Sequence, residues 1–326
     1  IRRLLTFLPT IIGVTLLTFV IARVIPANPA RLWAGGVKAK PEVIEMLTKK
    51  YHLDKPVYVQ YFYYLKDILS GDWGTSPVTH RSILADIKTY FPATVELAIF
   101  ALMLVMAIGI PLGIISALRK DSWIDHVVRV VAISGASIPV FWLGILLQWI
   151  FYYHLELFPA AGRGIVPHKV YTGLYLLDSI LSGDFKAFID NLSHMVLPAL
   201  TLAYPSIGLV ARITRGSMLD VLSAEYIDYA QVRGLKKSFI FKHVLKNASI
   251  PIITILGLIF GGLLSGAIVT ETIFSWPGIG TYAVGSIMNM DYPAIMGVTL
   301  LIGLIYVLVN FMVDLIYALI DPRIRL

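Results

Sequence analysis

The chain alternates long apolar runs with polar connections. Six of the runs contain about 20 residues or more, which is the length that an α-helix needs to cross a hydrocarbon core of about 30 Å. They occupy residues 4–25, 94–118, 127–153, 195–213, 252–274 and 294–320. The pattern predicts an all-α integral membrane protein with six transmembrane helices.

The connection between the first two runs, residues 26–93, is long enough to hold structure of its own. A proline at the first turn predicts a short helix over residues 41–51, and an aromatic-rich stretch predicts a second one over residues 57–69. We expect this connection to form a small extracellular lid. The chain then divides into a first transmembrane helix (residues 1–25), the lid (26–93) and a five-helix core (94–326).

Basic residues in the short connections predict the orientation of the spans. They cluster before the first run, after the second, between the fourth and fifth, and after the last: Arg2, Arg3, Arg119, Lys120, Arg129, seven Lys or Arg from Arg212 to Lys246, Arg323 and Arg325. Because cytoplasmic loops carry an excess of such residues, both termini are expected in the cytoplasm of a multi-pass protein of the cell membrane. The first run exceeds a signal core and lacks a small-x-small cleavage site, so it is expected to be a retained span.

Composition supports the membrane class and excludes several others. The 326 residues are 57% apolar and only 14% charged, against about 25% charged in soluble domains. The absence of cysteine excludes disulfides and thiolate metal sites, and the seven histidines form no His-x-x-x-His pair. We therefore expect no metal and no cofactor in this chain. The net charge of +7 is explained by the orientation signal, so lipid, and not nucleic acid, is the expected non-protein partner.

Residues 212–251 form a polar segment between two of the apolar runs. Within it, residues 223–234 are predicted to form a short helix. Ser223 is expected to cap the first N–H groups, Glu225 favours the positive N-terminus, and Gly234 supplies a left-handed stop. A helix of about ten residues is marginally stable in water by itself. Its order is therefore expected to come from docking on a partner.

One face of this predicted helix is apolar. It consists of Tyr226, Ile227, Tyr229 and Ala230, and it is flanked by Glu225, Asp228 and Gln231. Such a helix can lie in a groove of a cytosolic ATPase and move with it. It can also lie on anionic headgroups, which the lysines after Gly234 favour. The residues by themselves leave both interpretations open.

Five ionisable residues lie in or near the apolar runs: Arg23, Glu96, Arg129, Glu271 and Asp314. Charges in lipid are costly and are often functional. All five lie toward the ends of their runs, where snorkelling or an ion pair is the favoured explanation.

Prolines and small residues predict the shape and packing of the spans. Pro111 and Pro139 lie in two successive runs and predict bent helices. The glycines in the runs predict close helix packing.

A membrane bundle with proline-bent spans suggests the passage of a solute, but the chain shows no energy source of its own for it. It contains no Gly-x-x-x-x-Gly-Lys-Ser/Thr phosphate loop, so it does not itself hydrolyse nucleotide. Its runs show neither two similar halves nor midplane carboxylates, which disfavours an ion-coupled secondary carrier. No acid, base or metal constellation favours a membrane enzyme. We expect a non-catalytic subunit whose energy comes from a partner.

A motif in the polar segment carries a family resemblance. Asp228-Tyr-Ala-Gln-Val-Arg-Gly234, followed by His243-Val-Leu-Lys-Asn247 and Pro251, resembles the coupling motif of binding-protein-dependent ABC importer permeases. The chain is similar, along nearly its whole length, to the first of the two permease subunits of dipeptide and oligopeptide importers. Supporting matches are Gly71-Asp-Trp-Gly74, Ile138-Pro139, Phe141-Trp142, Glu271-Thr-Ile-Phe274 and Asp291-Tyr-Pro293. One departure is Pro26-Ala-Asn-Pro29, where the family usually has Pro-Gly-Asp-Pro and therefore a carboxylate.

The resemblance implies a type I, MetI-like bundle that works by alternating access. It also implies a second permease subunit, two cytoplasmic ATPases that bind ATP and Mg, and an extracellular solute-binding protein. The implied coupling residues are Glu225, Tyr226, Asp228, Tyr229, Ala230, Arg233 and Gly234. Candidates for the pore or outer gate are Pro139, Phe141, Trp142, Glu271, Phe274 and Trp276. The expected solutes are di- or oligopeptides, with oligosaccharides and nickel chelates as alternatives within the same kind of importer.

Overall fold

The computed structural model describes residues 2–24, 28–34 and 39–320. Within these ranges the chain is helical, and its only extended pairing is an isolated bridge between Thr75 and Ser82. The protein is therefore all-α over the described residues, as predicted.

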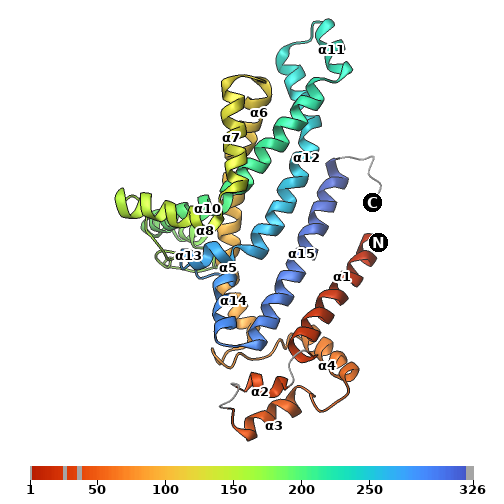
Figure 1. The fold of residues 1–326 in the computed structure, drawn as a ribbon, viewed down its shortest axis with the longest axis vertical. Helices are drawn as coiled ribbons and strands as arrows, with labels where there is room; N and C mark the ends of the chain where they lie inside the picture. Colours follow the sequence, from red (N-terminus) through yellow and green to blue (C-terminus); the bar gives the residue numbers. More distant parts are fainter. Residues whose placement is uncertain (1, 25–27, 35–38, 321–326) are drawn as a thin grey trace.

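The lid contains three short helices, α2 (Pro29–Trp33), α3 (Pro41–Lys50) and α4 (Val57–Ser70). They gather at one end of the molecule, at the foot of α1 (Arg2–Phe19), as Figure 1 shows. The two predicted lid helices are confirmed to within one residue. Asn28 caps α2 by accepting a hydrogen bond of 2.9 Å from a backbone N–H of its first turn. Asparagine can therefore start this helix at the position where the family usually has aspartate. Pro26 and Ala27 lie outside the described residues.

Four helical segments are long and apolar enough to cross a membrane: Ile83–Leu118, Phe185–Leu222, Lys237–Leu264 and Tyr292–Val313. The first comprises α5 (Ile83–Leu104), the π-helical segment η3 (Val105–Gly109) and α6 (Ile110–Leu118); the others lie in α10 (Phe185–Leu222), α12 (Lys237–Gly266) and α15 (Tyr292–Ile320). A fifth span results if the bent pair Trp123–Ser137 and Val140–His154 is counted as one. The first predicted span corresponds to α1 and the π-helical segment η1 (Val20–Val24), which contain a shorter apolar helix.

The third apolar run does not form a straight span. It is divided into α7 (Trp123–Ser137) and α8 (Val140–Leu147), the latter continued by the π-helical segment η4 (Gln148–His154). The two parts meet at an angle of 107°. Pro139 lacks an N–H, and it forces Ile138 out of the helical region to an extended conformation with ψ of 123°. The bend predicted at Pro139 is confirmed, whereas Ile83–Leu118 continues through Pro111 as one span.

Helix caps move two other boundaries away from the apolar runs. Ser82 starts α5 at Ile83, and Asp184 starts α10 at Phe185, because each side chain accepts a hydrogen bond from a backbone N–H of the first turn. The second and fourth spans therefore begin about three turns before the expected positions, and the division between residues 93 and 94 falls inside α5.

The fifth run is also divided, and two outer connections contain further helices. Helix α12 ends at Gly266, and a separate helix, α13 (Ile268–Ile273), follows it. Helix α14 (Ile279–Met288) precedes α15, and α9 (Tyr175–Ser182) precedes α10. These short helices pack beside the spans at mid-height or at the lid end of the molecule (Figure 1).

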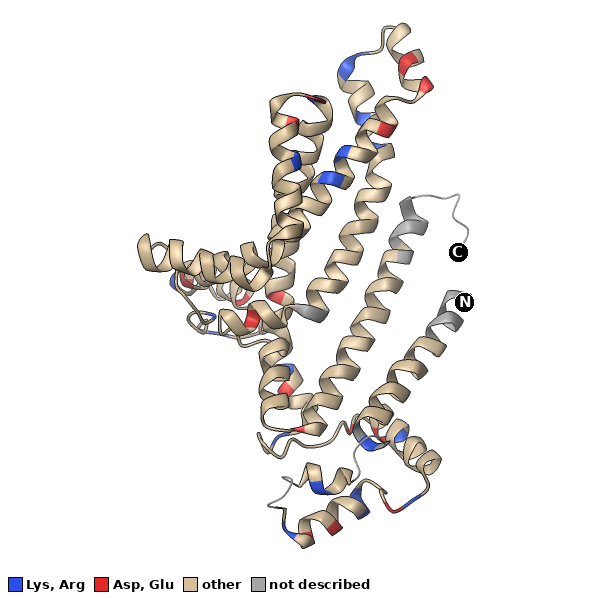
Figure 2. Ribbon diagram, viewed as in Figure 1, with Lys and Arg blue, Asp and Glu red and all other residues tan. Residues whose placement is uncertain are grey.

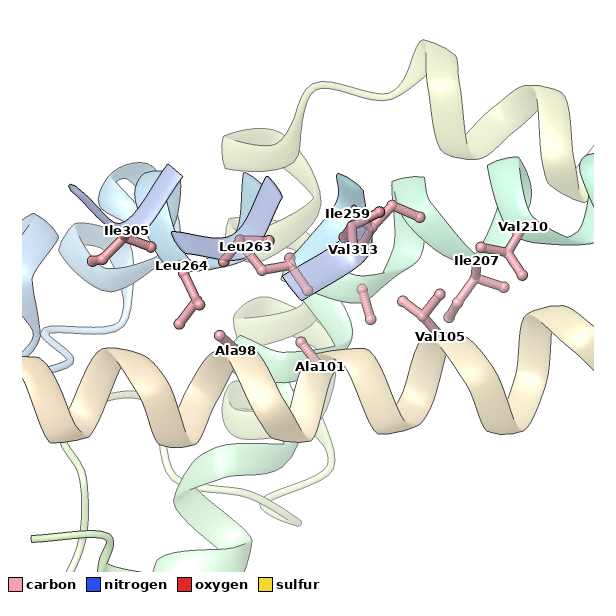
Figure 3. Packing of buried hydrophobic residues seen from close by; sticks show 12 residues of the cluster. Ala98, Ala101, Val105, Ile207, Val210, Ile259, Leu263, Leu264, Ile305 and Val313 are labelled. Carbon is pink, nitrogen blue, oxygen red and sulfur yellow. The ribbon is translucent and has the colours of Figure 1, made fainter. Parts of the chain in front are cut away.

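The central core lies where α5, α10, α12 and α15 meet. Its members include Ala98, Val105, Val210, Leu263 and Val309, and Figure 3 shows this cluster beside the Ile83–Leu118 span. Small residues permit this close packing: a Cβ added at Gly113 of α6 would lie 2.5 Å from the Cβ of Thr214 in α10. Close packing at glycine is thus confirmed here.

Charged residues mark the two ends of the bundle. In Figure 2 they concentrate around α11 (Glu225–Val232) at one end and around the lid at the other, with a further group beside α13. Residues 247–264 and 292–313, in the middle of α12 and α15, contain no charged side chain. This uncharged band is the part of the molecule suited to the hydrocarbon core.

Candidate functional site

Helix α11 joins α10 to α12 at the end of the molecule opposite the lid (Figure 1). Ala224 occupies its N-cap position, with extended backbone and no side-chain cap. Ser223 instead donates a hydrogen bond of 3.1 Å to the carbonyl of Asp220, in the preceding helix. The predicted Ser223 cap is therefore wrong, since this hydroxyl closes the last turn of α10.

The other end of α11 is terminated as predicted. Gly234 has a φ of +73°, which is the left-handed region that favours glycine. Its N–H donates to the carbonyl of Gln231 (2.9 Å), and the N–H of Leu235 donates to the carbonyl of Ala230 (3.2 Å). These bonds close the helix and turn the chain into α12.

The inner side of α11 packs against its own chain. Ile227 is fully buried among Ala117 of α6, Met218 of α10 and Val244 of α12, and Ala230 packs against the same cluster. The expectation that this helix depends entirely on a partner for its order is therefore wrong. Burial of about one large aliphatic side chain contributes roughly 1.5–3 kcal/mol to holding it.

The outer side of α11 is exposed. Tyr226 and Tyr229 are 49% and 59% exposed, and Val232 is 86% exposed. Asn247 of α12 donates a hydrogen bond of 2.8 Å to the Tyr226 hydroxyl, and the guanidinium carbon of Arg233 lies 4.6 Å from the centre of the Tyr229 ring. The predicted apolar face is therefore divided: Tyr226 and Tyr229 lie outward, with Glu225, Asp228 and Arg233 also exposed, whereas Ile227 and Ala230 pack inward.

A buried carboxylate ties α7 to α10 near the α11 end. Asp125, which is fully buried, accepts hydrogen bonds from Arg215 Nε and Nη2 (2.7 and 2.8 Å) and from the Ser116 hydroxyl (2.5 Å). The backbone N–H of Asp121 donates a fourth hydrogen bond (3.0 Å). A two-point Arg–carboxylate contact of this kind fixes geometry as well as distance. The pair therefore fixes the position of α7 relative to the end of α10.

A second polar cluster centres on Glu271 of α13. Its carboxylate accepts hydrogen bonds from the Thr94 hydroxyl (2.7 Å) and from the backbone N–H groups of Gly280 (2.7 Å) and Thr281 (3.1 Å). The last two groups belong to the first turn of α14, so Glu271 caps that helix. A Cβ at Gly278 would lie 2.5 Å from the Glu271 carboxyl carbon, which explains why glycine precedes this turn.

Phe274 and Trp276 complete this cluster and are fully buried. The indole N–H of Trp276 donates to the carbonyl of Ala93 (2.9 Å), and the Phe274 carbonyl accepts from the N–H of Gly162 (2.8 Å). The Phe274 ring also faces α8, since a Cβ at Gly144 would lie 3.3 Å from it. Spans α5 and α8, α13 and an outer connection therefore meet here.

The remaining pore or gate candidates lie on α8. Pro139 precedes its first residue and makes the bend, while Phe141 and Trp142 are 53% and 49% exposed. The structure therefore brings Glu271, Phe274 and Trp276 together in one cluster. The side chains of Phe141 and Trp142 lie outside this cluster.

Glu96 of α5 has a buried partner from the outer connection. Arg163 Nη2 lies 2.6 Å from Glu96 Oε2, and both side chains are less than a tenth exposed. The backbone N–H of Leu176 donates to the other carboxylate oxygen (2.6 Å), and the Tyr175 ring lies 3.8 Å from the guanidinium carbon. The expected ion pair is therefore present for Glu96.

The other four ionisable residues in or near the apolar runs differ in how their charges are accommodated. Arg129 lies 3.5 Å from Asp125, so an ion pair is present there too. Arg23 is buried and has no ion pair within the described part of the chain, so the expectation of snorkelling or pairing is wrong for it. Glu271 is buried and satisfied by neutral donors, not by a cation. Asp314 belongs to α15, but its side chain lies outside the described residues.

Two family models cover almost the whole chain. Residues 109–326 match the model described as binding-protein-dependent transport system inner membrane component. Residues 1–98 match the corresponding N-terminal model. The chain belongs to this family.

Relatives of the permease extend along its full length. It is 48% identical to the probable D,D-dipeptide transport system permease protein DdpB of Escherichia coli K12, covering 96% of this chain and 93% of that one. It is 44% identical to the dipeptide transport system permease protein DppB of Alkalihalophilus pseudofirmus, covering 99% and 98%. A chain of the inward-facing MetNI methionine ABC transporter superposes with a TM-score of 0.51 at 12% identity, covering 70% of this chain and 93% of that chain. The permease thus has the type I importer fold.

Sequence reasoning missed the most strongly paired groups of the permease. Asp125 and Arg215 are 90 residues apart, and Glu96 and Arg163 are 67 apart. The position of Glu96 in an apolar run indicated that it needs a cationic partner, but nothing in the linear chain identifies Arg163 as that partner. Asp125 follows Ser122 by three residues and looks like an ordinary first-turn acid. No group of three or more His, Cys, Asp or Glu able to hold a metal exists among the described residues of the permease.

Proposed function

We propose that this chain is one of two permease subunits of an ATP-driven importer for di- or oligopeptides. Its partners are a second permease, two cytoplasmic ATPases that bind ATP, and an extracellular solute-binding protein. The names of the two relatives support peptides over oligosaccharides or nickel chelates, since both are called dipeptide or D,D-dipeptide permeases and both align over nearly the whole chain.

The proposed orientation places α11 and both termini in the cytoplasm and the lid outside. The basic residues that surround α11, including Arg212, Arg215 and Lys246, support it because of the bias of positive charge toward cytoplasmic loops. Figure 2 shows basic residues around α11 at the end opposite the lid.

The observation that carries the proposal is the division of α11 into two sides. Ile227 fixes the helix to α10 and α12, while Tyr226, Tyr229 and Val232 face outward and are between about half and nine-tenths exposed. An ATPase groove that binds the outward side would move α11 as a rigid part of its own chain. A helix that only lies on lipid headgroups does not need this packing against α10 and α12.

Movement of α11 reaches the outer side along connected elements. It shifts the end of α10, which Arg215 and Asp125 link to α7. Helix α7 ends at the bend before Pro139, and α8 then contacts Phe274 beside the Glu271 cluster. We propose that this cluster is the outer gate and that α8 transmits the movement to it.

The test is uptake by proteoliposomes that contain both permeases, the ATPases and the binding protein. Labelled Ala-Ala should accumulate inside only when ATP is supplied on the α11 side. Accumulation in vesicles that lack the ATPases would refute the proposed coupling. ATP-dependent accumulation of a labelled oligosaccharide but not of Ala-Ala would refute the proposed solute and leave the coupling intact.

A further inference from the structure

A small cavity lies between the lid and the core. Its walls come from the end of the first span (Arg23), from α2 and α4 of the lid (Trp33, Tyr64), from the loop before α5 and from the start of α15. Figure 1 shows the lid helices gathered beside the foot of α1 and near the start of α15. The cavity is therefore positioned where the lid joins the transport core.

Three buried polar atoms on this cavity lack a hydrogen-bond partner among the described residues. They are Arg23 Nε, Trp33 Nε1 and the Tyr64 hydroxyl. All three side chains are more than nine-tenths buried. The first two can only donate, and the third can donate as well. Such groups are rarely left unsatisfied in a folded protein, so their concentration on one cavity indicates a ligand that offers acceptors.

Aromatic rings hold the Arg23 guanidinium in place. The rings of Phe19, Trp33, Tyr51 and Tyr64 surround it, with their centres 5.4–5.7 Å from the guanidinium carbon. One nitrogen, Nη1, donates to the Tyr51 carbonyl at 3.2 Å. With the charge held this way, the N–H groups in the plane of the guanidinium remain the groups able to donate to a ligand.

Acidic groups line the outer part of the same cavity. Asp67 is half-buried and Asp72 is exposed, and neither forms an ion pair with Arg23 within the described residues. Burial raises the pKa of Asp67, and the neighbouring Asp72 raises it further. A cation brought next to these two carboxylates would relieve both effects.

Size restricts what can enter. The cavity volume is about 40 Å³ and the cavity is partly open, which gives room for roughly three water-sized groups. A carboxylate with its carbon fits, whereas a whole dipeptide does not.

We propose that this cavity is a binding site for a small zwitterion of the α-amino-acid type. The carboxylate enters and accepts hydrogen bonds from Arg23 Nε, Trp33 Nε1 and the Tyr64 hydroxyl. The ammonium group faces Asp67 and Asp72 at the opening. The site is separate from the coupling helix and does not depend on the solute that the importer carries.

The test uses tritiated glycine as the probe in scintillation proximity binding to the purified membrane complex in lipid nanodiscs. The soluble binding protein is left out, so that its own site does not contribute. Saturable binding is expected, displaced more effectively by acetate at high concentration than by equal concentrations of methylammonium. Trp33→Phe and Tyr64→Phe, which keep a ring but remove one donor, should each weaken glycine binding about tenfold.

Tyr58→Phe is the matched control, because Tyr58 lies on the same helix as Tyr64 but is 76% exposed and outside the cavity. It should leave glycine binding unchanged. Melting of the complex checks folding: removal of an unpartnered buried hydroxyl should not lower the melting temperature of Tyr64→Phe. The proposal is overturned if glycine does not bind, if methylammonium displaces it as well as acetate, or if the folded Trp33 and Tyr64 variants bind it normally.

Discussion

The Arg215 guanidinium donates two hydrogen bonds to the buried Asp125 carboxylate, one from Nε (2.7 Å) and one from Nη2 (2.8 Å). The pair links α10, which leads directly into α11, with α7, which leads to the bend at Pro139.

Removal of the Arg215 charge should therefore affect stability and coupling together. Arg215→Gln leaves the buried Asp125 carboxylate with only the more distant, half-exposed Arg129 as a cation, and we expect the free energy of unfolding to fall by up to about 3–5 kcal/mol. Denaturation of the purified complex, followed by tryptophan fluorescence, measures the change. Arg129→Gln is the control, because Arg129 is 45% exposed and lies 3.5 Å from the same carboxylate; its effect should stay within about 1 kcal/mol. Equal effects of the two variants would contradict the assigned role.

The two sides of α11 should respond differently to truncation. Ile227→Ala removes a fully buried side chain and should lower the free energy of unfolding by about 2–5 kcal/mol. Tyr229→Ala removes an exposed ring and should leave stability nearly unchanged while the ATPases no longer co-purify with the permease. Melting curves and pull-down of the ATPases separate the outcomes. Normal ATPase binding and normal uptake by Tyr229→Ala would argue against an ATPase on this side.

The end of α11 needs a residue that tolerates positive φ. Gly234→Val places a β-branched residue at φ +73°, although nothing lies within 4 Å of the new Cβ, so the cost is backbone strain of about 1–3 kcal/mol. We expect the protein to reach the membrane but to lose ATP-driven uptake. Asparagine tolerates this conformation better, so Gly234→Asn should keep most of the uptake. If valine supports the same uptake rate as glycine, the turn has no part in coupling.

The buried pair of Arg163 and Glu96 should hold the connection of residues 155–184 against α5. Arg163→Met leaves the Glu96 carboxylate without its cation, and loss of the contact to the Gly173 carbonyl (2.6 Å) frees the loop further. We expect faster cleavage of this connection by a protease added from the lid side, measured by mass spectrometry of the fragments. The double variant Glu96→Gln with Arg163→Met removes the unpaired charge and should recover part of the resistance. A single variant as resistant as the unaltered protein would show that the pair does not anchor the loop.

The lid helices and the stop of α11 could be predicted because their signals are local. Proline at the first turn of α3 and glycine at position 234 act on their own backbone, so a few neighbouring residues suffice. The bend at Pro139 is local in the same way. The predicted start of α11 shows the limit of such signals. The Ser223 hydroxyl could bond either to the first turn of α11 or to the last turn of α10, and it donates to a carbonyl of α10.

The membrane class, the positions of the apolar runs and the family were determined by the sequence by itself, since hydrophobic length, composition and motif order are properties of the linear chain. Only the tertiary structure decided that Ile227 is buried while Tyr229 is not, that the Thr94 hydroxyl donates to Glu271, and that Arg215 pairs with Asp125. The physical reason is distance along the chain. Burial and ion pairing depend on which helices meet, and residues about 70 to 180 positions apart carry no mark in the sequence that names their partner.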